Sequence, residues 1–456
     1  MSGNFIFYLA AFAVALGVLI VVHELGHFLV ARLCGIKVLR FSVGFGRVLL
    51  ARCYGADRTE WVISAFPLGG YVRMLDEREA PVAEHELGRA FNRQAIWKRI
   101  LVVGAGPAAN LLLALLLYWV LFMHGMEELR PILAAPPAAT VAARAGVEEG
   151  ETVRSINGKS VLTWQELRWE LLQAALDRTP TKLEVINSRQ EISDRNLDLQ
   201  DITEADLDAD LPPRLGLKPY RPRLQPIIGV VSPGSVAEQA GLRGGDEVVS
   251  IDGQSIQSWN EVAARIRSAA GTALQLELRR GAEHVNLQVT PVAAMDGNQS
   301  VGRIGIMARE DPALRAQLTV VVQYPVLTAL SKACAQTWSM STFSLKMIGR
   351  MLIGDVSWKN LSGPVTIADY AGQSARLGLP YYLKFLALIS ISLGVLNLLP
   401  IPILDGGHLL YYMVEIIKGG PLSERVMEIG QKIGLSLLMI LMALAFYNDI
   451  NRFVSG

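Results

Sequence analysis

The chain has 456 residues, of which 51% are hydrophobic and 19% are charged. This composition is too apolar for an ordinary soluble enzyme of this length and predicts an integral membrane protein. The 43 basic and 42 acidic residues nearly cancel, and no run of Lys or Arg stands out, so we expect no nucleic-acid partner. The cysteines Cys34, Cys53 and Cys334 are too few and too far apart to predict a disulfide framework or a thiolate metal site.

The first predicted element is a membrane-spanning helix over residues 1–31. Every residue from Phe5 to Val22 is apolar or small, and this run of about 18 residues is close to the ~20 that a helix needs to cross the hydrocarbon layer. A cleaved signal peptide is the alternative interpretation. The stretch has no basic N-terminal region and no small-x-small cleavage site, so we favour the span.

Three further apolar stretches predict spans over residues 100–123, 381–405 and 431–450. The chain is therefore expected to be a polytopic α-helical membrane protein with four transmembrane helices. Lys and Arg are concentrated between the first two spans, in residues 32–99, so by the positive-inside rule this loop is cytoplasmic. The loop at 406–430 is then cytoplasmic too, whereas the N-terminus and the long stretch 124–380 lie outside.

Within the first cytoplasmic loop, residues 38–72 predict β hairpins. Apolar residues with a strand pattern are interrupted there by glycines such as Gly44, Gly46 and Gly69. Apolar strands beside a membrane can dip into it where protein or a water-filled cavity covers the backbone. We expect a membrane-associated β region, and a small surface sheet is the alternative.

The outer region contains an internal repeat. Residues 131–166 recur without a gap at 226–261, with about fourteen identities that include an Ala-Gly pair, a Ser-Ile pair and Trp-x-Glu. So many matches at one offset predict two tandem copies of a small α+β domain, at 127–221 and 222–310.

The second copy resembles bacterial PDZ domains through Ala240-Gly241-Leu242, Gly245-Asp246-Glu247-Val248 and Ile251-Asp252-Gly253. PDZ domains bind an extended peptide as an added strand at an open sheet edge. Four consecutive residues are expected to form the strand beside that groove, namely Ile227, Ile228, Gly229 and Val230. A plain spacer is the alternative for either copy. The first copy is the weaker candidate, because Pro136-Pro137 remove donors from its equivalent strand.

The strongest local signal is His23-Glu24-Leu25-Gly26-His27, at the inner end of the first span. On a helix the two histidines lie one turn apart on one face and can bind one zinc ion, while Glu24 lies beside them to take a proton from the attacking water. Ionisable side chains cost free energy when they are placed inside a membrane span, so those found there usually have a function. The position of this motif within a span therefore supports a metal site. A structural core histidine would explain only one of the three polar residues.

A catalytic zinc keeps three protein ligands and one open position, so a third ligand must come from elsewhere in the chain. Asp405 ends the third predicted span. Asp405 and His23 each lie about 18 to 20 residues from the outer start of their spans, or ~27 to 30 Å at 1.5 Å per residue, so both reach the same level near the cytoplasmic side. We therefore predict one zinc ion per chain on His23, His27 and Asp405. His408 is the competing ligand, although it falls a turn beyond the apolar run.

The same depth argument constrains residues 311–380. A span within Val320–Leu352 would reverse the third span and carry Asp405 to the outer side, out of reach of His23. We therefore expect an amphipathic helix at the membrane interface instead, in contact with membrane lipid.

Three residues near the end of the third predicted span are candidates for substrate binding. A peptide bond in a membrane helix is shielded by its own hydrogen bonds, so a protease there must unwind its substrate and offer other partners. Asn397 supplies a side-chain amide, and Pro400 and Pro402 break the helix and free backbone groups. Pro-kinked helix packing with a hydrogen-bonded Asn397 is the alternative.

Together these segments resemble the site-2 protease family of M50-type intramembrane zinc metalloproteases. The matching segments cover nearly the whole chain in order, namely His23 to His27, Gly44-Phe45-Gly46, Pro67 to Val72, the tandem repeat, Ser362-Gly363-Pro364-Val365 and Asn397 to Gly406. The resemblance implies a multi-pass protein of a Gram-negative inner membrane with two periplasmic PDZ domains. It also implies substrates that are single-pass membrane proteins of the anti-sigma factor type, cut after another protease has trimmed them, and remnant signal peptides. The PDZ pair would then exclude untrimmed substrates by size.

Two functions of other classes compete with regulated intramembrane proteolysis. A membrane adaptor would capture protein tails with its PDZ pair and hold zinc structurally, but a structural zinc site has four ligands and no use for the adjacent Glu24. A zinc transporter would need a polar path across the bilayer, whereas the spans show one polar level. We therefore predict an intramembrane zinc metalloendopeptidase.

Overall fold

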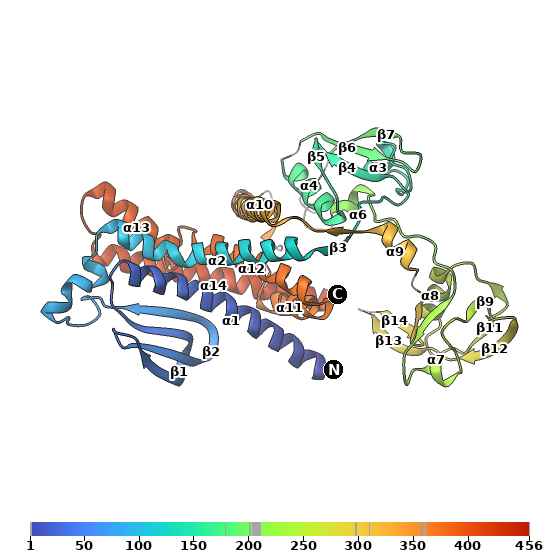
Figure 1. The fold of residues 1–456 in the computed structure, drawn as a ribbon, viewed down its shortest axis with the longest axis horizontal. Coiled ribbons are helices and arrows are strands. Elements are labelled where there is room, and N and C mark those ends of the chain that lie inside the picture. The colour runs from blue at the N-terminus through green and yellow to red at the C-terminus, as the bar shows by residue number, and fades with distance from the viewer. Residues whose placement is uncertain are drawn as a thin grey trace. The chain divides into compact units, whose positions relative to one another are not determined.

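The computed structural model describes residues 2–177, 179–199, 202, 211–296, 299–309, 311–354, 356–358 and 362–455. The chain divides into two compact units (Figure 1). One unit comprises Met1–Met126 and Val321–Phe453 and is mainly helical. The other comprises Glu127–Val320 and Val454–Gly456, and it contains most of the strands.

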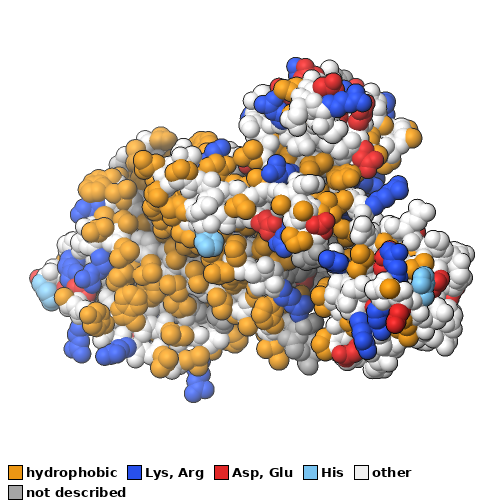
Figure 2. Space-filling view, turned by 45° about the vertical axis from the view of Figure 1, so that its right-hand side comes forward, with side chains coloured by type: hydrophobic (Ala, Val, Ile, Leu, Met, Phe, Trp, Pro, Cys, Tyr) orange, Lys and Arg blue, Asp and Glu red, His pale blue; other side chains and the backbone are white. Residues whose placement is uncertain are grey.

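Among its described residues, the helical unit has four helices long and apolar enough to cross a membrane, as expected: Ile6–Leu33, Ile96–His124, Leu379–Asn397 and Glu424–Asn451. They belong to α1 (Ser2–Leu33), α2 (Ile96–His124), α12 (Leu379–Asn397) and α14 (Glu424–Ser455). Large apolar side chains are exposed along all four, including Leu9, Leu112, Leu116, Leu388, Ile433 and Ile440. Figure 2 shows such side chains spread over the face of this unit, which is the surface that lipid requires.

The third candidate span differs from its predicted extent. Its helix ends at Asn397 rather than at 405, and the predicted loop at 406–430 begins instead with the helix α13 (Asp405–Lys418). Pro400 and Pro402 lie in the irregular segment between the two helices, where a missing N–H and the fixed proline ring are tolerated. Asp405 therefore opens a new helix.

The predicted β hairpins form one sheet from β1 (Val38–Tyr54) and β2 (Thr59–Met74). The first part of β1 lies in the middle of the sheet. Phe41 pairs there with Val72 on one side and with Trp61 on the other. Residues 70–74 and 48–54 form the two edges. Figure 1 shows the sheet beside α1, and Val48, Leu49 and Leu50 are exposed in the edge segment 48–54.

The described part of the helical unit also contains α10 (Val326–Ile353) and α11 (Pro364–Leu377). The amphipathic helix predicted within Val320–Leu352 corresponds to α10, which is not one of the four candidate spans. The start of α11 is held by Asp449 of α14, whose carboxylate accepts hydrogen bonds from the Gly363 N–H (2.9 Å) and the Thr366 hydroxyl (2.6 Å). A carboxylate at a helix N-terminus is favourable because it meets free N–H groups and the positive end of the helix dipole.

The second unit contains two four-stranded sheets with equivalent strand orders, β5-β4-β6-β7 and β10-β9-β11-β12. Each copy of the repeat has its own core, and buried positions correspond along the repeat. Val153 and Ile156 of the first copy match Val248 and Ile251 of the second, and all four side chains are at most 1% exposed.

The bounds of the other elements are η1 (Glu84–Arg89), η2 (Phe91–Arg93), β3 (Met126–Leu129), α3 (Val141–Arg144), β4 (Thr152–Ile156), β5 (Lys159–Ser160), α4 (Trp164–Leu176), β6 (Thr181–Ile186), β7 (Ile192–Leu197), α6 (Leu211–Leu215), β8 (Ile228–Val231), α7 (Val236–Gln239), β9 (Glu247–Ile251), β10 (Gln254–Ser255), α8 (Trp259–Ser268), β11 (Leu274–Arg280), β12 (Glu283–Val289), β13 (Val292–Asp296), β14 (Gln299–Arg303), β15 (Ile306–Ala308), α9 (Pro312–Leu318) and β16 (Thr319–Val322).

Candidate metal centre

The two histidines of the first span converge on one point. The Nε2 atoms of His23 and His27 are 3.2 Å apart. The Nδ1 atom of His27 lies 2.8 Å from the carbonyl oxygen of Val102 on α2, so this nitrogen carries the proton and Nε2 keeps its lone pair for a metal. His23 Nδ1 is 3.3 Å from the side-chain amide of Asn110, also on α2. The neighbouring helix thus orients both rings.

Asp405 completes the group from the first turn of α13. Its carboxylate oxygens lie 3.2 Å from His23 Nε2 and 3.6 Å from His27 Nε2. Among the described residues, these three form the group that can hold a metal ion, with ligand atoms all within 4.8 Å of one another. His408 is not a member, and its ring instead packs edge-on against Tyr411.

The spacing of these three donors fits zinc. With zinc to nitrogen and oxygen bonds of about 2.0–2.1 Å, two ligands of a tetrahedral site lie about 3.3 Å apart. The three observed separations are 3.2, 3.2 and 3.6 Å. Two imidazoles and one carboxylate are also a donor set of catalytic zinc sites, which keep a fourth position open.

Glu24 interacts electrostatically with all three members of this group and is buried, with 8% of the residue exposed. Gly70, in the edge segment of β2, lies directly against Glu24. A Cβ atom on Gly70 would come within 2.8 Å of both Glu24 Cγ and the Ser42 carbonyl oxygen. Only glycine therefore allows the sheet edge to approach this closely, and sequence reasoning placed Gly70 in the β region without linking it to Glu24.

Gly106 of α2 allows a similar close approach to the histidines. A Cβ atom there would lie 2.2 Å from His27 Nε2 and 2.8 Å from His23 Cε1. Asn110, about one turn further along α2, also contacts His23, so both ends of the segment Gly106 to Asn110 face the histidines.

The variant Gly106→Ala should therefore lose both zinc and cleavage, because its methyl group occupies the space of the His27 ring. A misplacement of about 1 Å in such a site costs on the order of 100-fold in rate. Gly104 is the matched control in the same helix, since a Cβ atom there meets nothing within 4 Å. Zinc content and cleavage of both purified variants are the measurements. Equal loss in Gly104→Ala, or no loss in Gly106→Ala, would contradict this placement.

The segment between Asn397 and Asp405 is held by close backbone contacts. A Cβ atom on Gly406 would lie 2.2 Å from the Leu399 carbonyl oxygen, and one on Gly407 would lie 2.4 Å from that of Ile401. These glycines let the start of α13 fold back onto the segment. Asn397 is half-buried and Pro400 is exposed, so both are accessible to a substrate, and their role in binding stays a prediction.

The sequence matches peptidase family M50 over residues 11–441. The chain belongs to peptidase family M50. It is 40% identical to the regulator of sigma-E protease RseP of Escherichia coli over 98% of this chain and 99% of the relative. It is 42% identical to a putative zinc metalloprotease of Neisseria meningitidis over 97% and 99% of the two chains. These relatives confirm the predicted zinc metalloprotease of the site-2 type.

Among solved structures, the PDZ domain of an SdrC-like protein from Listeria monocytogenes is similar to part of this M50 peptidase. The identity is 22%, the TM-score is 0.17, and the match covers 20% of this chain and 90% of that one.

The predicted peptide groove of the second repeat copy needs correction. Ile227, Ile228, Gly229 and Val230 were expected at an open sheet edge, but β8 has neighbours on both sides. One side pairs with β15, and on the other the Ile228 N–H donates to the Asp246 carbonyl oxygen (2.8 Å). A strand with two occupied edges cannot add a third partner. In the described part of this M50 peptidase, β15 (Ile306–Ala308) has β8 as its one partner strand, so the open edge lies there.

Proposed function

We propose that this M50 peptidase holds one zinc ion on His23, His27 and Asp405 and cleaves single-pass membrane proteins within the bilayer. The observation that supports this most is the convergence of three donor atoms, two from α1 and one from the first turn of α13, beside the buried Glu24. Zinc at this site would supply a Lewis acid that polarises the scissile carbonyl and lowers the pKa of water.

Glu24 is the general base in this proposal. It takes a proton from the attacking water as the water adds to the substrate carbonyl, and it then gives that proton to the leaving amine. Its carboxylate has no room to move away from the histidines on the side of the sheet, because Gly70 lies against it. This arrangement keeps Glu24 next to the three metal ligands.

The neighbouring backbone provides a place for the unwound substrate. Residues 70–74 form an edge of the β1-β2 sheet and begin next to Glu24. A substrate strand that pairs with this edge exchanges its helical hydrogen bonds for new ones, which removes the main obstacle to cleavage in lipid. The side-chain amide of Asn397 and the backbone groups freed at Pro400 and Pro402 offer further polar partners where α12 ends.

Two other functions fit the structure less well. A structural zinc in a membrane adaptor would be closed by four ligands, whereas the described residues here supply three together with an adjacent carboxylate that is not needed for structure. A zinc transporter would need polar groups at several levels of the spans. The ionisable cluster of this protein lies at a single level, where α1 meets the start of α13.

We also infer the setting of the reaction. Relatives named as regulators of sigma-E support substrates of the anti-sigma factor type, and remnant signal peptides share the same single-span form. The protein would lie in an inner membrane, with its active site near the cytoplasmic side and its N-terminus in the periplasm. The two repeat copies would be periplasmic PDZ domains, which exclude untrimmed substrates by size or bind extended peptide at β15.

Cleavage of a single-pass substrate in detergent tests this function together with its size limit. A substrate with a short outer tail should be cut, a zinc chelator should stop the cut, and added zinc should restore it. The same substrate with a folded domain on that tail should be cut at least about tenfold more slowly. Cleavage that resists the chelator would overturn the zinc mechanism, and equal rates for both tails would overturn the size filter.

A further inference from the structure

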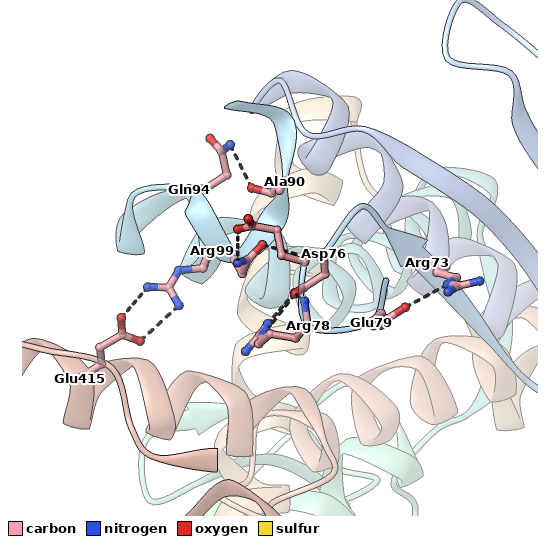
Figure 3. Close-up of polar contacts among 10 residues, drawn as sticks. Arg73, Asp76, Arg78, Glu79, Ala90, Gln94, Arg99 and Glu415 are labelled. Carbon is pink, nitrogen blue, oxygen red and sulfur yellow. Dashed lines mark hydrogen bonds and ion pairs between the residues drawn. The ribbon is translucent and has the colours of Figure 1, made fainter. Parts of the chain in front are cut away.

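A buried ion pair joins the start of α2 to α13, well away from the metal ligands in sequence. Arg99, in the first turn of α2, faces Glu415 near the end of α13 (Figure 3). Its two terminal nitrogens donate to the two carboxylate oxygens over 3.2 and 2.7 Å. A parallel two-bond pair of this kind fixes orientation as well as distance.

The surroundings of this pair are largely closed to water. The side chains of Arg99 and Glu415 are 12% and 17% exposed. The Arg99 guanidinium also lies over the ring of Tyr412, 4.9 Å from its centre, and Tyr412 is itself buried. Arg99 thus contacts two residues of α13 that are about one helical turn apart. Removing either charge would leave the other buried and uncompensated.

A second charged pair sits beside the first. Asp76 follows the edge segment of β2 and is 9% exposed, and Arg78 donates to its carboxylate over 2.9 Å (Figure 3). Burial opposes ionisation of Asp76, but the hydrogen bonds from Arg78, helped by the charge of Arg99, outweigh it and hold the pKa of Asp76 below its usual range. The cluster therefore gathers α2, α13 and the end of the β sheet around alternating charges.

Two of these three elements, α13 and α2, reach the metal centre. α13 begins with Asp405, and a rigid helix of ~15 Å connects Asp405 to Glu415. α2 holds Gly106 against the histidines, seven residues or about two turns after Arg99. A rotation of α13 against α2 at Glu415 would therefore move the Asp405 carboxylate relative to the two Nε2 atoms.

We propose that Arg99 and Glu415 are positioning residues, whose ion pair locks α13 onto α2 and thereby sets the Asp405 carboxylate against His23 and His27. This inference rests on the proposed zinc site. The pair touches no donor atom itself, so it acts through the helix that carries Asp405. Its removal should weaken zinc binding specifically, as loss of partners that orient metal ligands does in other sites.

The test compares variants of the full-length protein by zinc affinity in competition with a chelator, by cleavage and by thermal unfolding of the zinc-free form. Glu415→Gln should lower zinc affinity about 10- to 100-fold. The exchanged double variant Arg99→Glu, Glu415→Arg should recover most of that loss. Glu428→Gln is the matched control, because Glu428 forms an exposed pair with Lys432 on α14, and it should behave like the wild type.

Two outcomes would overturn the positioning role. One is unchanged zinc affinity in Glu415→Gln, whether or not the unfolding temperature falls, and the other is a double variant that folds but binds zinc as weakly as the single variant. Failure of the proposed function looks different, because the wild type would then bind no zinc or would cleave without it.

Discussion

Replacing Glu24 by glutamine should abolish cleavage and leave zinc bound. Glutamine has nearly the shape of glutamate, so the packing against Gly70 is kept, but it cannot accept the proton of the attacking water. Loss of a general base lowers rates by about 10²- to 10⁴-fold. The three ligand atoms belong to other residues, so zinc content should equal that of the wild type. Cleavage of a short-tailed single-pass substrate and metal analysis of the purified variant are the measurements.

A second carboxylate provides the control for this variant. Glu428 forms an exposed ion pair with Lys432 on α14. Glu428→Gln makes the same chemical change and should leave both zinc content and cleavage unaltered, because exposed pairs contribute little. Substantial cleavage by Glu24→Gln would contradict the assignment of the base and would favour the adaptor function.

Replacing Asp405 by asparagine should remove zinc from the protein. Asparagine keeps the size of the side chain but loses the negative charge that lies 3.2 and 3.6 Å from the two imidazole nitrogens. We expect zinc affinity to fall at least about 100-fold, beyond the effect of residues that only orient ligands, and cleavage to fall with it. Chelator competition measures the affinity directly.

His408 is the informative comparison for Asp405, because the sequence left it open as a ligand. In the structure it lies against Tyr411 and outside the group of donors. His408→Gln should keep zinc affinity within a few-fold of the wild type. If His408→Gln lost zinc and Asp405→Asn retained it, the choice of third ligand would be wrong.

The spans, the repeat and the zinc motif could be predicted because each is a local pattern. A long apolar run is enough to predict a membrane span, whichever segments pack against it. His23 and His27 lie on one face of a helix because they are four residues apart. Helix rise and orientation placed Asp405 at the level of His23, although α12 ends at Asn397 and Asp405 begins the separate helix α13. These features depend on the nearby chain, so a single sequence contains them.

The parts that sequence reasoning missed depend on distant contacts. Arg99 and Glu415 are 316 positions apart, and no local pattern links them. The helix that starts at Asp405 depends on the close approach of Gly406 and Gly407 to the segment before it, which two adjacent glycines do not by themselves reveal.

The error at the peptide groove has the same origin. The repeat directed attention to residues 226–261, but the strand with the open edge, Ile306–Ala308, lies beyond the matched segment and returns to pair with β8. Which edge of a strand is free is decided by such long-range pairing. Periodicity alone cannot supply it.

The most direct test of the central claim is the position of the cut. The single-pass substrate is incubated in lipid vesicles with the wild type and with Glu24→Gln, and the new termini are identified by mass spectrometry. A zinc site on His23 and His27, within the candidate span Ile6–Leu33, predicts one cut inside the apolar segment of the substrate, made by the wild type alone. Cuts confined to the flanking tails, or the same cut made by Glu24→Gln, would contradict intramembrane proteolysis at this site.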